Sequence, residues 1–536
     1  MSGTAAPAAP APTPPLTAGR LAMYGLASLT FGLTQGLGNN LVAANLQAVQ
    51  ASFGATANEA AWLTAAYAST SITASILLFK LRTQFGLRLF AKLGLGLFLL
   101  VSLAHLVAND LRSAVVLRAV AGFASAPLNT LAILYMIEIF PPSQKLTVGI
   151  ALGLIGAQIA VPIARLVSPG LLETGLWDQL HLLELALACL SLAIVLVLPI
   201  TPPPRAKVFD RVDAVSLPLL IVGLGLVAVV LGLGRGYWWL EASWLGGCLA
   251  GGLACLTLLV AVELNRERPL VNLHWLSSSD MLLFGGSMFF ARFILSEQTT
   301  GAIGFFQNLG LLNEHMQGLF LVILAATLAG LIGVAFVNRP ENRPAIHAVA
   351  LAMIAVGAWM ESRGTSLTRP HDVYLPQALV AFGGAIFLPA ATGWSFTHTL
   401  RSGVNYLTSF FAVFLASQNL GGLLGAAALG TLVTVREKFH SSHIVESLTL
   451  ADPLVAQRIG QYGAAYNRVI GDPALRAAEG NLTLAGVATC EAYVLAYNDL
   501  FLAGSAVSVF CLAVLLIHQL AAWLGRHAAQ DSGTVA

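Results

Sequence analysis

The sequence contains little charge for its length. Only 10% of its 536 residues are Asp, Glu, Lys or Arg, whereas soluble domains contain about 25%. The formal net charge of +2 lacks the excess basicity that is typical of nucleic-acid binding. The five cysteines lie far apart, without the spacing of metal ligands or of a disulfide framework. We therefore expect neither a nucleic-acid partner nor a metal or other cofactor.

Several motifs of enzymes and of ATP-driven proteins are also missing. The sequence has no Gly-x-x-x-x-Gly-Lys-Ser/Thr motif, which cradles nucleotide phosphates. It has neither the His-Glu-x-x-His motif of zinc hydrolases nor the Gly-x-Ser-x-Gly motif of serine hydrolases. We therefore expect that the chain does not hydrolyse ATP by itself and that it is not an enzyme.

Long apolar stretches dominate the chain. A helix needs about 20 mostly apolar residues to cross a bilayer, where it satisfies its own backbone hydrogen bonds. Fourteen stretches meet this requirement, so the sequence predicts an all-α polytopic membrane protein with fourteen transmembrane helices. The predicted spans are 23–49, 61–80, 89–108, 113–139, 146–169, 179–200, 214–234, 243–263, 281–305, 316–337, 345–361, 374–399, 405–433 and 497–524.

The basic residues predict the orientation of the chain. With a cytoplasmic N-terminus, fifteen of the 27 Lys and Arg residues fall in cytoplasmic tails and short loops, and four in short outer loops. This asymmetry is the one that the positive-inside rule requires. We therefore expect both termini in the cytoplasm, with 1–20 as a disordered tail without a signal peptide and 526–536 as a second tail.

Segment 436–496 is the only sizeable stretch outside the predicted spans, and the same orientation places it on the outer face. Its sequence is mixed polar and is broken by Pro453, Gly471 and Pro473 into short helical patterns. We interpret it mainly as a solvated connector. The alternative is a docking surface for a periplasmic partner.

Lys80 and Lys92 lie at the cytoplasmic ends of their spans and are counted with the loops. Three basic residues remain inside predicted spans: Arg118, Arg165 and Arg292. An ionisable residue inside a transmembrane helix costs about 2.5–3.5 kcal/mol on insertion scales, so each is a candidate functional residue. One turn deeper than Arg118 lies Gly122, which would let a neighbouring helix approach. We interpret Arg118 as a coupling residue, with a structural arginine bonded to backbone carbonyls as the alternative.

Arg165 and Glu184 lie at similar depth on two consecutive predicted spans joined by a short loop. Antiparallel helices with a short connection are expected to be neighbours, so we predict an ion pair between these two side chains. Such a pair would keep Glu184 ionised, and its loss would favour protonation, which is the basis of a proton-linked switch. A permanent structural pair is the alternative.

The ninth predicted span carries Arg292 and, five residues later, Glu297. Five residues correspond to about 140° around a helix, so the two side chains are expected to address different neighbours. Glu297 is interpreted either as a second carboxylate in a cavity or as a solvated group near the outer interface.

Amide side chains form two further groups. Gln35 and Asn39 are four residues apart and share a face of the first span, and Gln418 and Asn419 lie in the thirteenth. All four can hydrogen-bond a ligand or a facing helix. They are candidate substrate-binding residues, with helix–helix packing as the favoured alternative.

Several local motifs are similar to those of a known family. The best match is the fourth span, where Arg118 is followed four residues later by Gly122, as in the motif B of that family. The chain resembles the fourteen-span drug:proton antiporters of the major facilitator superfamily, the EmrB/QacA type, over roughly residues 21–525. Further matches are Trp62-Leu63-Thr64, Pro141-Pro142, Phe209-Asp210, Gly234-Arg235-Gly236 with Trp238 and Trp239, and the run from Arg436 to Glu446.

The chain also departs from the family pattern. Phe79 and Thr83 replace a glycine and an aspartate between the second and third spans, and Val161 replaces the glycine before a retained proline. In the first span, Leu37-Gly38 aligns with the Leu-Asp pair of the family. We therefore expect a divergent member.

The resemblance implies a fold of two six-helix bundles, at 21–200 and 281–525, the second including the outer loop 436–496. A linker and an inserted helix pair would occupy 201–280. It also implies export of small amphipathic compounds, drugs or toxic metabolites, by proton antiport with alternating access across the inner membrane. Arg118, Glu184, Arg165, Glu297 and Arg292 would then serve proton or conformational coupling.

The implied partners are a small-molecule substrate, protons and the lipid bilayer. A periplasmic membrane-fusion adaptor with an outer-membrane channel is a further implied partner. Two other functions stay open at this point. One is export of an endogenous metabolite such as a siderophore or an aromatic acid, and the other is a transport-incompetent membrane scaffold or receptor.

Overall fold

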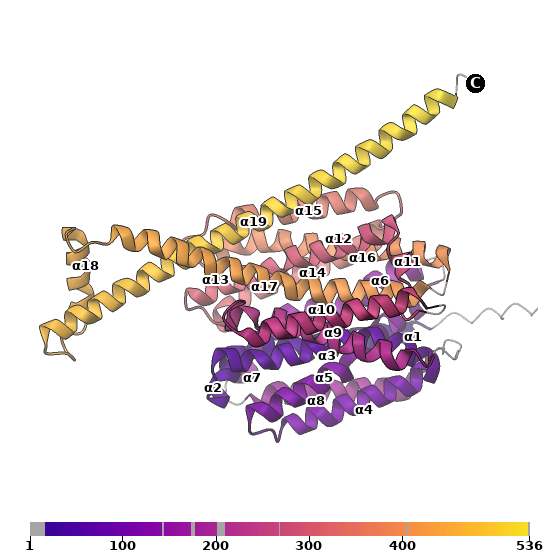
Figure 1. The fold of residues 1–536 in the computed structure, drawn as a ribbon, viewed down its shortest axis with the longest axis horizontal. Helices are drawn as coiled ribbons and strands as arrows, with labels where there is room; N and C mark the ends of the chain where they lie inside the picture. The colour runs from indigo at the N-terminus through magenta and orange to yellow at the C-terminus, as the bar shows by residue number, and fades with distance from the viewer. Residues whose placement is uncertain are drawn as a thin grey trace, which may run out of the picture.

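The computed structural model describes residues 17–141, 144–172, 177–200, 209–266, 269–403 and 406–533. These residues form helices and loops, and no β-strand occurs among them. The long helices lie side by side, with the N-terminal half (indigo and purple) below the C-terminal half (orange and yellow) in Figure 1. Most of the predicted N-terminal tail lies outside the described residues, and the first helix begins at Ala18.

The N-terminal half holds the first six predicted spans. The first span is one helix followed by a short second helix, and the fifth is assembled from a π-helical turn and two helices. The elements are α1 Ala18–Ala44, α2 Leu46–Phe53, α3 Ala57–Phe85, α4 Leu87–His105, α5 Leu111–Ile139, η1 Lys145–Gly149, α6 Ile150–Gly153, α7 Ile155–Leu172 and α8 Asp178–Val197.

The inserted pair and the C-terminal half follow. The ninth predicted span is also composite, because a π-helical turn interrupts it. The elements are α9 Asp213–Tyr237, α10 Ser243–Leu264, α11 Leu273–Leu276, α12 Ser279–Ser296, η2 Glu297–Ala302, α13 Ile303–Asn308, η3 Asn313–Met316, α14 Gln317–Val337, α15 Arg343–Glu361, η4 Pro370–Val373, α16 Tyr374–Ser402, α17 Leu407–Ser447, α18 Pro453–Ala464 and α19 Pro473–Gly533.

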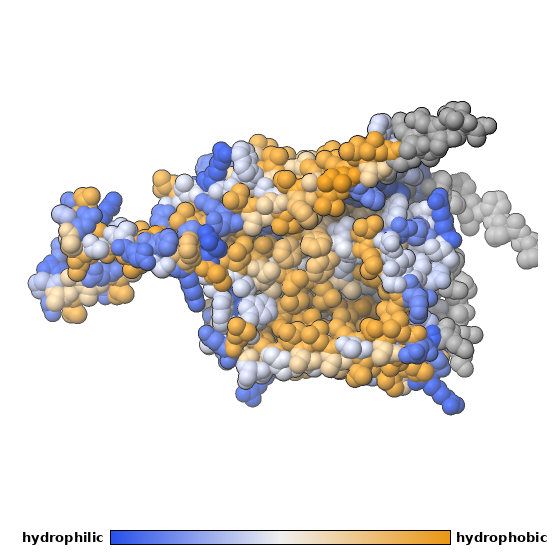
Figure 2. Space-filling model, turned by 45° about the horizontal axis from the view of Figure 1, so that its top comes forward, coloured by the Kyte–Doolittle hydropathy of each residue, from blue (hydrophilic) through white to orange (hydrophobic). Residues whose placement is uncertain are grey.

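Eleven helices in the described part of the chain are long and apolar enough to cross a membrane. The other three predicted spans, 23–49, 61–80 and 281–305, coincide with α1, with α3 and with the composite of α12, η2 and α13. Figure 2 shows a broad apolar surface over the middle of the helix bundle and hydrophilic residues towards both of its ends. The protein is therefore an all-α polytopic membrane protein, and the number of fourteen spans stays a prediction.

Helix ends and crossings follow from local sequence. A capping box begins α3, because the Thr56 side chain accepts from the Glu59 amide and the Glu59 carboxylate accepts from the Thr56 amide. Where α1 crosses α7, a Cβ on Gly32 would lie 2.8 Å from the Cα of Gly156, so only glycine permits this approach. The close approach predicted at Gly122 is confirmed, because this residue of α5 packs directly against the backbone of α3.

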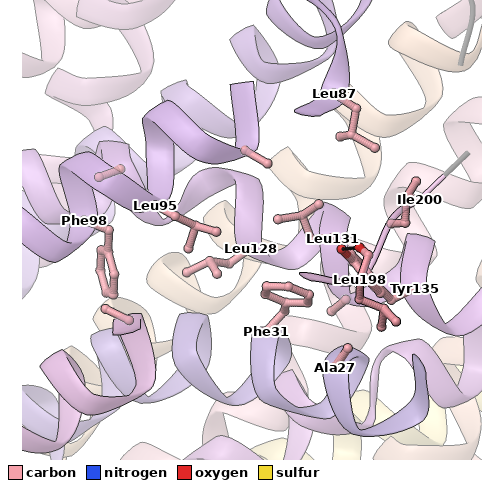
Figure 3. Packing of buried hydrophobic residues seen from close by; sticks show 14 of the residues in the cluster. Ala27, Phe31, Leu87, Leu95, Phe98, Leu128, Leu131, Tyr135, Leu198 and Ile200 are labelled. Carbon is pink, nitrogen blue, oxygen red and sulfur yellow. Dashed lines mark hydrogen bonds between the residues drawn. The ribbon is translucent and has the colours of Figure 1, made fainter. Parts of the chain in front are cut away.

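The core of the N-terminal half lies between α1, α4 and α5. Figure 3 shows Phe31, Leu95, Phe98 and Leu128 packed together there. Tyr135 lies at one end of the same cluster, and its hydroxyl donates to the Leu198 carbonyl at 2.8 Å. The buried Tyr135 hydroxyl in Figure 3 is thus hydrogen-bonded, as expected for a buried polar group.

The segment predicted as outer loop 436–496 is almost entirely helical, and two of its helices are longer than the short helical patterns expected from the sequence. α17 continues past the predicted end of its span to Ser447, and α19 runs without interruption from Pro473 to Gly533. With α18 they form a hairpin that projects from one end of the bundle, whereas the start of α1 and the end of α19 lie towards the opposite end (Figure 1). The predicted breaks at Pro453 and Pro473 are confirmed as helix starts.

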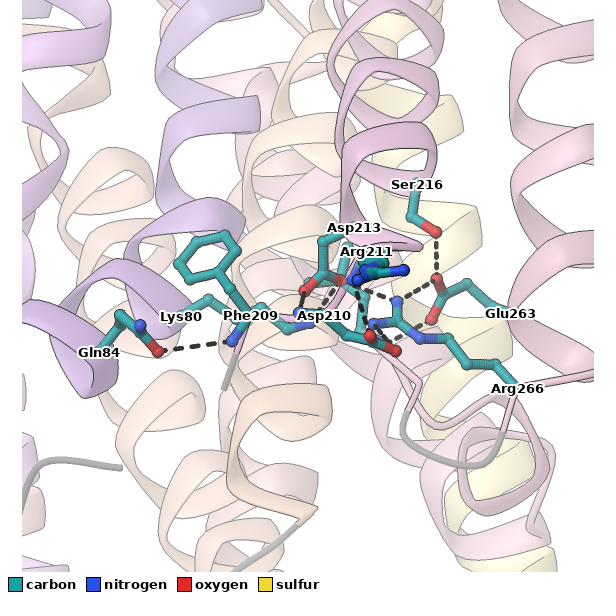
Figure 4. Close-up of polar contacts among 10 residues, drawn as sticks. Lys80, Gln84, Phe209, Asp210, Arg211, Asp213, Ser216, Glu263 and Arg266 are labelled. Atoms are coloured by element: carbon teal, nitrogen blue, oxygen red, sulfur yellow. Dashed lines mark hydrogen bonds and ion pairs between the residues drawn. The ribbon is translucent and has the colours of Figure 1, made fainter. Parts of the chain in front are cut away.

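A buried charge network attaches the inserted helix pair to the N-terminal half (Figure 4). The Lys80 ammonium of α3 lies 2.6 Å from the Asp213 carboxylate at the start of α9. Arg266, just after α10, lies 2.8 Å from Asp213 and 3.1 Å from Glu263. α9 also packs against α17 of the C-terminal half. The inserted pair therefore contacts both halves of the bundle, and the Lys80–Asp213 ion pair joins it to the N-terminal one.

Candidate functional site

A central cavity of about 220 Å³ lies between the two halves of the bundle, and a second one of about 160 Å³ adjoins it. The walls of the larger cavity come from α1, α5 and α7 on one side and from α12, η2, α14, α16 and α17 on the other. Six residues line both cavities, so the two share a wall. These residues are Gln35, Asn39, Ser71, Arg292, Gln418 and Asn419.

All four amides singled out in the sequence line this cavity. Among the described residues, the side chains of Gln35, Asn39 and Asn419 have no hydrogen-bond partner, and Gln418 has only a 3.7 Å contact with the sulfur of Met288. They are therefore not fixed as links between helices. Their donors and acceptors are directed at the cavity, where a bound molecule can reach them.

Arg292 projects from α12 into both cavities. Its guanidinium is buried and makes no hydrogen bond or ion pair with any described residue. Two glycines of α17 give it room. A Cβ on Gly421 would lie 3.2 Å from the Arg292 Cβ, and one on Gly422 would lie 3.3 Å from its Nε. The backbone of α17 thus forms a shelf along which the arginine reaches the cavity.

Glu297 points away from Arg292, as the five-residue spacing predicts. It is 1% exposed and does not line either cavity, so both interpretations of this residue, a cavity carboxylate and a solvated one, are wrong. The π-helical turn η2 begins at this residue and turns its side chain towards α15. There the polar side chains that face it are Glu361 and Gln377.

Glu297 and Glu361 form a buried carboxyl pair. Both Glu297 oxygens and one Glu361 oxygen lack a hydrogen-bond donor among the described residues, and no basic side chain there lies within ion-pair distance. A hydrogen-bonded path leads from this pair to the cavity. Gln377 donates to Glu361 at 2.7 Å and accepts from Gln298, a cavity residue, at 3.1 Å.

Arg118 is the centre of a second buried cluster. It is fully buried, donates to the Gly38 carbonyl at 2.7 Å, and lies 3.9 Å from the Glu184 carboxylate. Its guanidinium also lies over the ring of Tyr67, 4.4 Å from the centroid. Tyr67 itself lines the smaller cavity. One aromatic ring therefore separates the Arg118 cluster from the space between the two halves.

Two histidines complete this cluster. His181 lies one turn before Glu184 on α8, and its Nδ1 is 2.9 Å from the carboxylate. The rings of His181 and His105 stack with their centroids 4.2 Å apart. Both Nε2 atoms are buried and lack a hydrogen-bond partner in the described part of the chain. The carboxylate thus lies between an arginine and an imidazole.

The predicted ion pair between Glu184 and Arg165 is wrong. Arg165 donates instead to the Asn313 side chain at 3.0 Å, across the interface between the halves. The reason is helix packing: α1 packs extensively against both α7 and α8, and α8 packs mainly against α4 and α1 rather than against its neighbour in sequence. Matched depth on consecutive spans is therefore no evidence of contact in this fold.

Arg165 belongs to a polar latch between the halves. Asn313 of η3 also donates to the Ala44 carbonyl and to Asn45, at 3.1 and 3.2 Å. Asn45 in turn donates to Ser168 of α7 at 2.6 Å. The latch lies at the end of the bundle where α2 and the projecting hairpin lie (Figure 1). In this structure it holds the two halves together at that end.

Sequence reasoning missed Glu361, Gln377, His105 and His181. Glu361 is the last residue of its helix and reads as an interfacial charge, although it is 4% exposed. A polar residue deep in an apolar run was the available signal for Gln377. The spacing of His181 and Glu184, three residues apart on one helix face, was a signal for that contact.

Comparisons with known proteins agree with this architecture. Residues 26–426 match the sequence model of the Major Facilitator Superfamily. The fatty acid resistance protein FarB of Neisseria gonorrhoeae is 21% identical, with 94% of this chain and 97% of that protein covered. The multidrug export protein EmrB of Escherichia coli K12 is 22% identical over 66% of this chain and 69% of its own. The human organic anion transporter MFSD10 has a similar structure, with a TM-score of 0.57 at 13% identity, covering 91% of this chain and 99% of that one.

Proposed function

Because the chain belongs to the major facilitator superfamily, we propose that it is a secondary active exporter of small amphipathic compounds, driven by proton antiport. The observation that carries this proposal is the central cavity, whose walls come from both halves and combine free amides with apolar side chains. Binding at the middle of such an interface, with rocking of one half against the other, is how alternating access works. The family and its fold are those of membrane transporters rather than enzymes.

The names of two relatives support export as the proposed direction of transport. FarB, which matches nearly the whole chain, is named for resistance to fatty acids, and EmrB is named for multidrug export. These names support removal of amphipathic molecules from the cell as the activity proposed for this chain. Drugs or toxic metabolites are therefore the proposed substrates, and the inner membrane is the proposed location, with both termini in the cytoplasm.

The Glu297–Glu361 pair is the proposed proton site. A proton on either carboxyl would supply the hydrogen-bond donor that these buried oxygens lack. Two carboxyl groups in contact titrate as a unit, so the pair can bind and release a proton as its surroundings change. Gln377 and Gln298 connect the pair to the cavity. The side-chain amides of Gln377 and Gln298 thus link substrate binding in the cavity to protonation of the carboxyl pair.

Glu184 with Arg118 is the proposed second coupling group, and Arg165 with Asn313 the proposed conformational latch. Opening the bundle at the latch end requires breaking the Arg165–Asn313 hydrogen bond. Arg118 of α5 is hydrogen-bonded to the Gly38 carbonyl of α1. Movement of α1 during rocking would therefore shift Arg118 relative to the Glu184 carboxylate.

The projecting hairpin is the proposed docking site for a periplasmic membrane-fusion adaptor, which would lead to an outer-membrane channel. It reaches well beyond the apolar surface of the bundle (Figure 2). It also carries exposed apolar side chains, of which Leu450, Leu454 and Val469 are 75%, 69% and 85% exposed. Exposed apolar residues on a projecting element are typical of a partner-binding surface.

Transport by everted inner-membrane vesicles tests the proposed function. Respiring vesicles are acidic inside, so antiport should accumulate fluorescent amphipaths in a manner that depends on the chain and is abolished by an uncoupler. We would use 2-naphthalenesulfonate and trimethyl-2-naphthylammonium, which are permanently charged. Replacing Glu297 and Glu361 together with Gln should abolish the response to the gradient, whereas Glu241→Gln, in an exposed loop, should not. Accumulation of neither probe, or accumulation that survives the uncoupler, would refute proton antiport.

A further inference from the structure

The walls of the central cavity contain one charged side chain among the described residues, that of Arg292. Building on the proposed function, we infer that the substrates are organic anions, whose acidic group binds Arg292 while an apolar body fills the rest of the cavity. The substrate class is thereby narrowed from amphipathic compounds in general to those with a carboxylate, sulfonate or phosphate head group.

The guanidinium is available for such a group. An arginine within a bilayer-spanning bundle is costly unless something compensates its charge. Arg292 has no carboxylate or carbonyl partner in the described part of the chain. Of the four buried glutamates, Glu263 of the inserted helix pair faces Arg266. The three in the N-terminal and C-terminal halves are also turned elsewhere. Glu184 faces Arg118, and Glu297 and Glu361 face each other. None of the three lines the cavity.

The four amides extend this site. Gln35 and Asn39 of α1 and Gln418 and Asn419 of α17 line the same part of the cavity as Arg292. Each amide carries an NH₂ group that can donate to an oxyanion. A guanidinium donates two parallel hydrogen bonds to carboxylate, sulfonate or phosphate oxygens, and these bonds are stronger than neutral ones. The site therefore offers donors from both halves of the protein to one anionic group.

The rest of the cavity wall combines apolar and polar side chains. The residues that line only the larger cavity include many apolar ones. Among them are Leu154, Val161, Pro162, Leu295, Ile323, Leu388, Phe414 and Leu415. A volume of about 220 Å³ is below the roughly 300–1,000 Å³ of typical drug-sized pockets. The body that it accepts in this conformation is therefore small, such as one or two fused rings.

A cationic amphipath is disfavoured by the same arrangement. It would bring a second positive charge beside Arg292 without any carboxylate in the cavity wall to offset it. Repulsion in a site of low dielectric constant discriminates between partners by several kcal/mol. The cavity thus selects its substrates by their charge rather than by their shape.

Binding of two matched probes to the purified full chain in lipid nanodiscs tests this inference. The probes are 2-naphthalenesulfonate and trimethyl-2-naphthylammonium, which differ mainly in the sign of the charge, and equilibrium dialysis gives the affinity. We expect the sulfonate to bind and the ammonium ion not to bind. Arg292→Gln should weaken sulfonate binding by about thirtyfold or more, as expected when one partner of a desolvated charge pair is removed.

Three further variants sharpen the test. Arg292→Lys should retain part of the sulfonate affinity, because it keeps the charge without the planar fork of donors. Arg292→Glu should reverse the preference and bind the ammonium probe. Arg401→Gln, which removes an exposed arginine at the end of α16, should bind the sulfonate as the parent does.

The outcomes separate this inference from the proposed function. Preference of the parent for the ammonium probe, equal sulfonate binding by Arg292→Gln and the parent, or binding of neither probe would each overturn the anion assignment. Sulfonate binding that depends on Arg292, together with vesicle uptake that ignores the proton gradient, would retain the assignment and refute proton antiport. Gradient-driven uptake of the ammonium probe would refute the anion assignment and retain proton antiport.

Discussion

The Oε1 atom of Glu184 lies 3.1 Å from the point where a Cβ atom on Gly38 would stand. The glycine therefore makes room on α1 for a carboxylate that comes from α8. The carbonyl of the same glycine accepts a hydrogen bond from Arg118. In the drug:proton antiporters that the sequence resembles, the residue aligned with Gly38 is an aspartate. In this chain the carboxylate beside the buried arginine is supplied by a different helix.

We therefore predict that an aspartate in place of Gly38 on α1 can replace Glu184 as the carboxylate beside Arg118. Glu184→Gln alone should abolish gradient-driven uptake, because Arg118 loses its carboxylate. Gly38→Asp alone should lower the yield of folded protein, because two carboxylates would crowd one arginine. Breaking a buried charge pair costs about 3–5 kcal/mol. The combination of both changes should recover folding and part of the uptake.

Size-exclusion chromatography of the detergent-solubilised protein would measure folding, and vesicle uptake would measure transport. Glu241→Gln serves as the control for the loss of a carboxylate outside the bundle. A combined variant that is no better than the worse single variant would show that the two positions are not interchangeable.

The length and place of most helices could be predicted from the sequence. The thickness of the bilayer sets the length of an apolar run, so the run itself marks the helix. The continuation of α17 to Ser447 could not be predicted this way, because its last turns are polar and lie outside any apolar run. The π-helical turn at Glu297 was equally hidden, since apolar periodicity does not distinguish it from an α-helical turn.

The members of the site could be predicted better than their partners. Arg118, Arg292 and Glu297 stand out because charge is costly in a span. Which helices touch is decided by three-dimensional packing, which the order of the spans does not encode. The sequence therefore predicts an ion pair between Glu184 and Arg165, on the preceding helix, whereas Glu184 pairs with Arg118 in the structure.

Gln377 is predicted to connect the carboxyl pair to the cavity. Gln377→Met keeps the volume and removes the hydrogen bonds to Glu361 and Gln298. A hydrogen bond to a charged group contributes about 1.5–3 kcal/mol, so gradient-driven uptake should fall by about tenfold or more. Probe binding should be unchanged, because Gln377 does not line the cavity. Gln461→Met, exposed on α18, is the control. A variant that loses binding and uptake in proportion would contradict a role in coupling.

Arg165 is predicted to keep the hairpin end of the bundle closed. In a background with the five native cysteines replaced by serine, Asn39→Cys would report access to the cavity. Arg165→Ala should increase the rate at which an impermeant thiol reagent, added from the hairpin side, modifies this cysteine. The hydrogen bond to Asn313 is lost in that variant, so the open state becomes more populated. Arg369→Ala, in an exposed loop, should leave the rate unchanged. Unchanged modification in Arg165→Ala would rule out the latch.

The hairpin is predicted to lie outside the cytoplasm. The excess of basic residues in the opposite loops supports this orientation, and the start of α1 and the end of α19 lie towards the end opposite the hairpin (Figure 1). A reporter enzyme that is active only outside the cytoplasm should be active when fused at Gly471 and silent at Arg339, between α14 and α15. The reverse pattern would invert the direction of transport that is proposed here.

The anchor of the inserted helix pair is predicted to respond unequally to the loss of its two partners. Asp213 lies within 3 Å of both Lys80 and Arg266, whereas Asp213 is the one ion-pair partner of Lys80 among the described residues. Asp213→Asn therefore strands the buried Lys80, whereas Arg266 keeps Glu263. Lys80→Met strands neither residue, because Asp213 keeps Arg266. Loss of one partner of a buried pair costs about 3–5 kcal/mol, so Asp213→Asn should lower the unfolding temperature more than Lys80→Met does.

The double variant Lys80→Met with Asp213→Asn should be more stable than Asp213→Asn alone, because the stranded Lys80 cation is gone. The two residues would then show a coupling energy in a double-mutant cycle, as expected for direct contact. The unfolding temperature of the detergent-solubilised protein, followed by tryptophan fluorescence, gives all three values. Strictly additive effects would mean that Lys80 and Asp213 do not interact, and that α9 is held to α3 by apolar packing rather than by this ion pair.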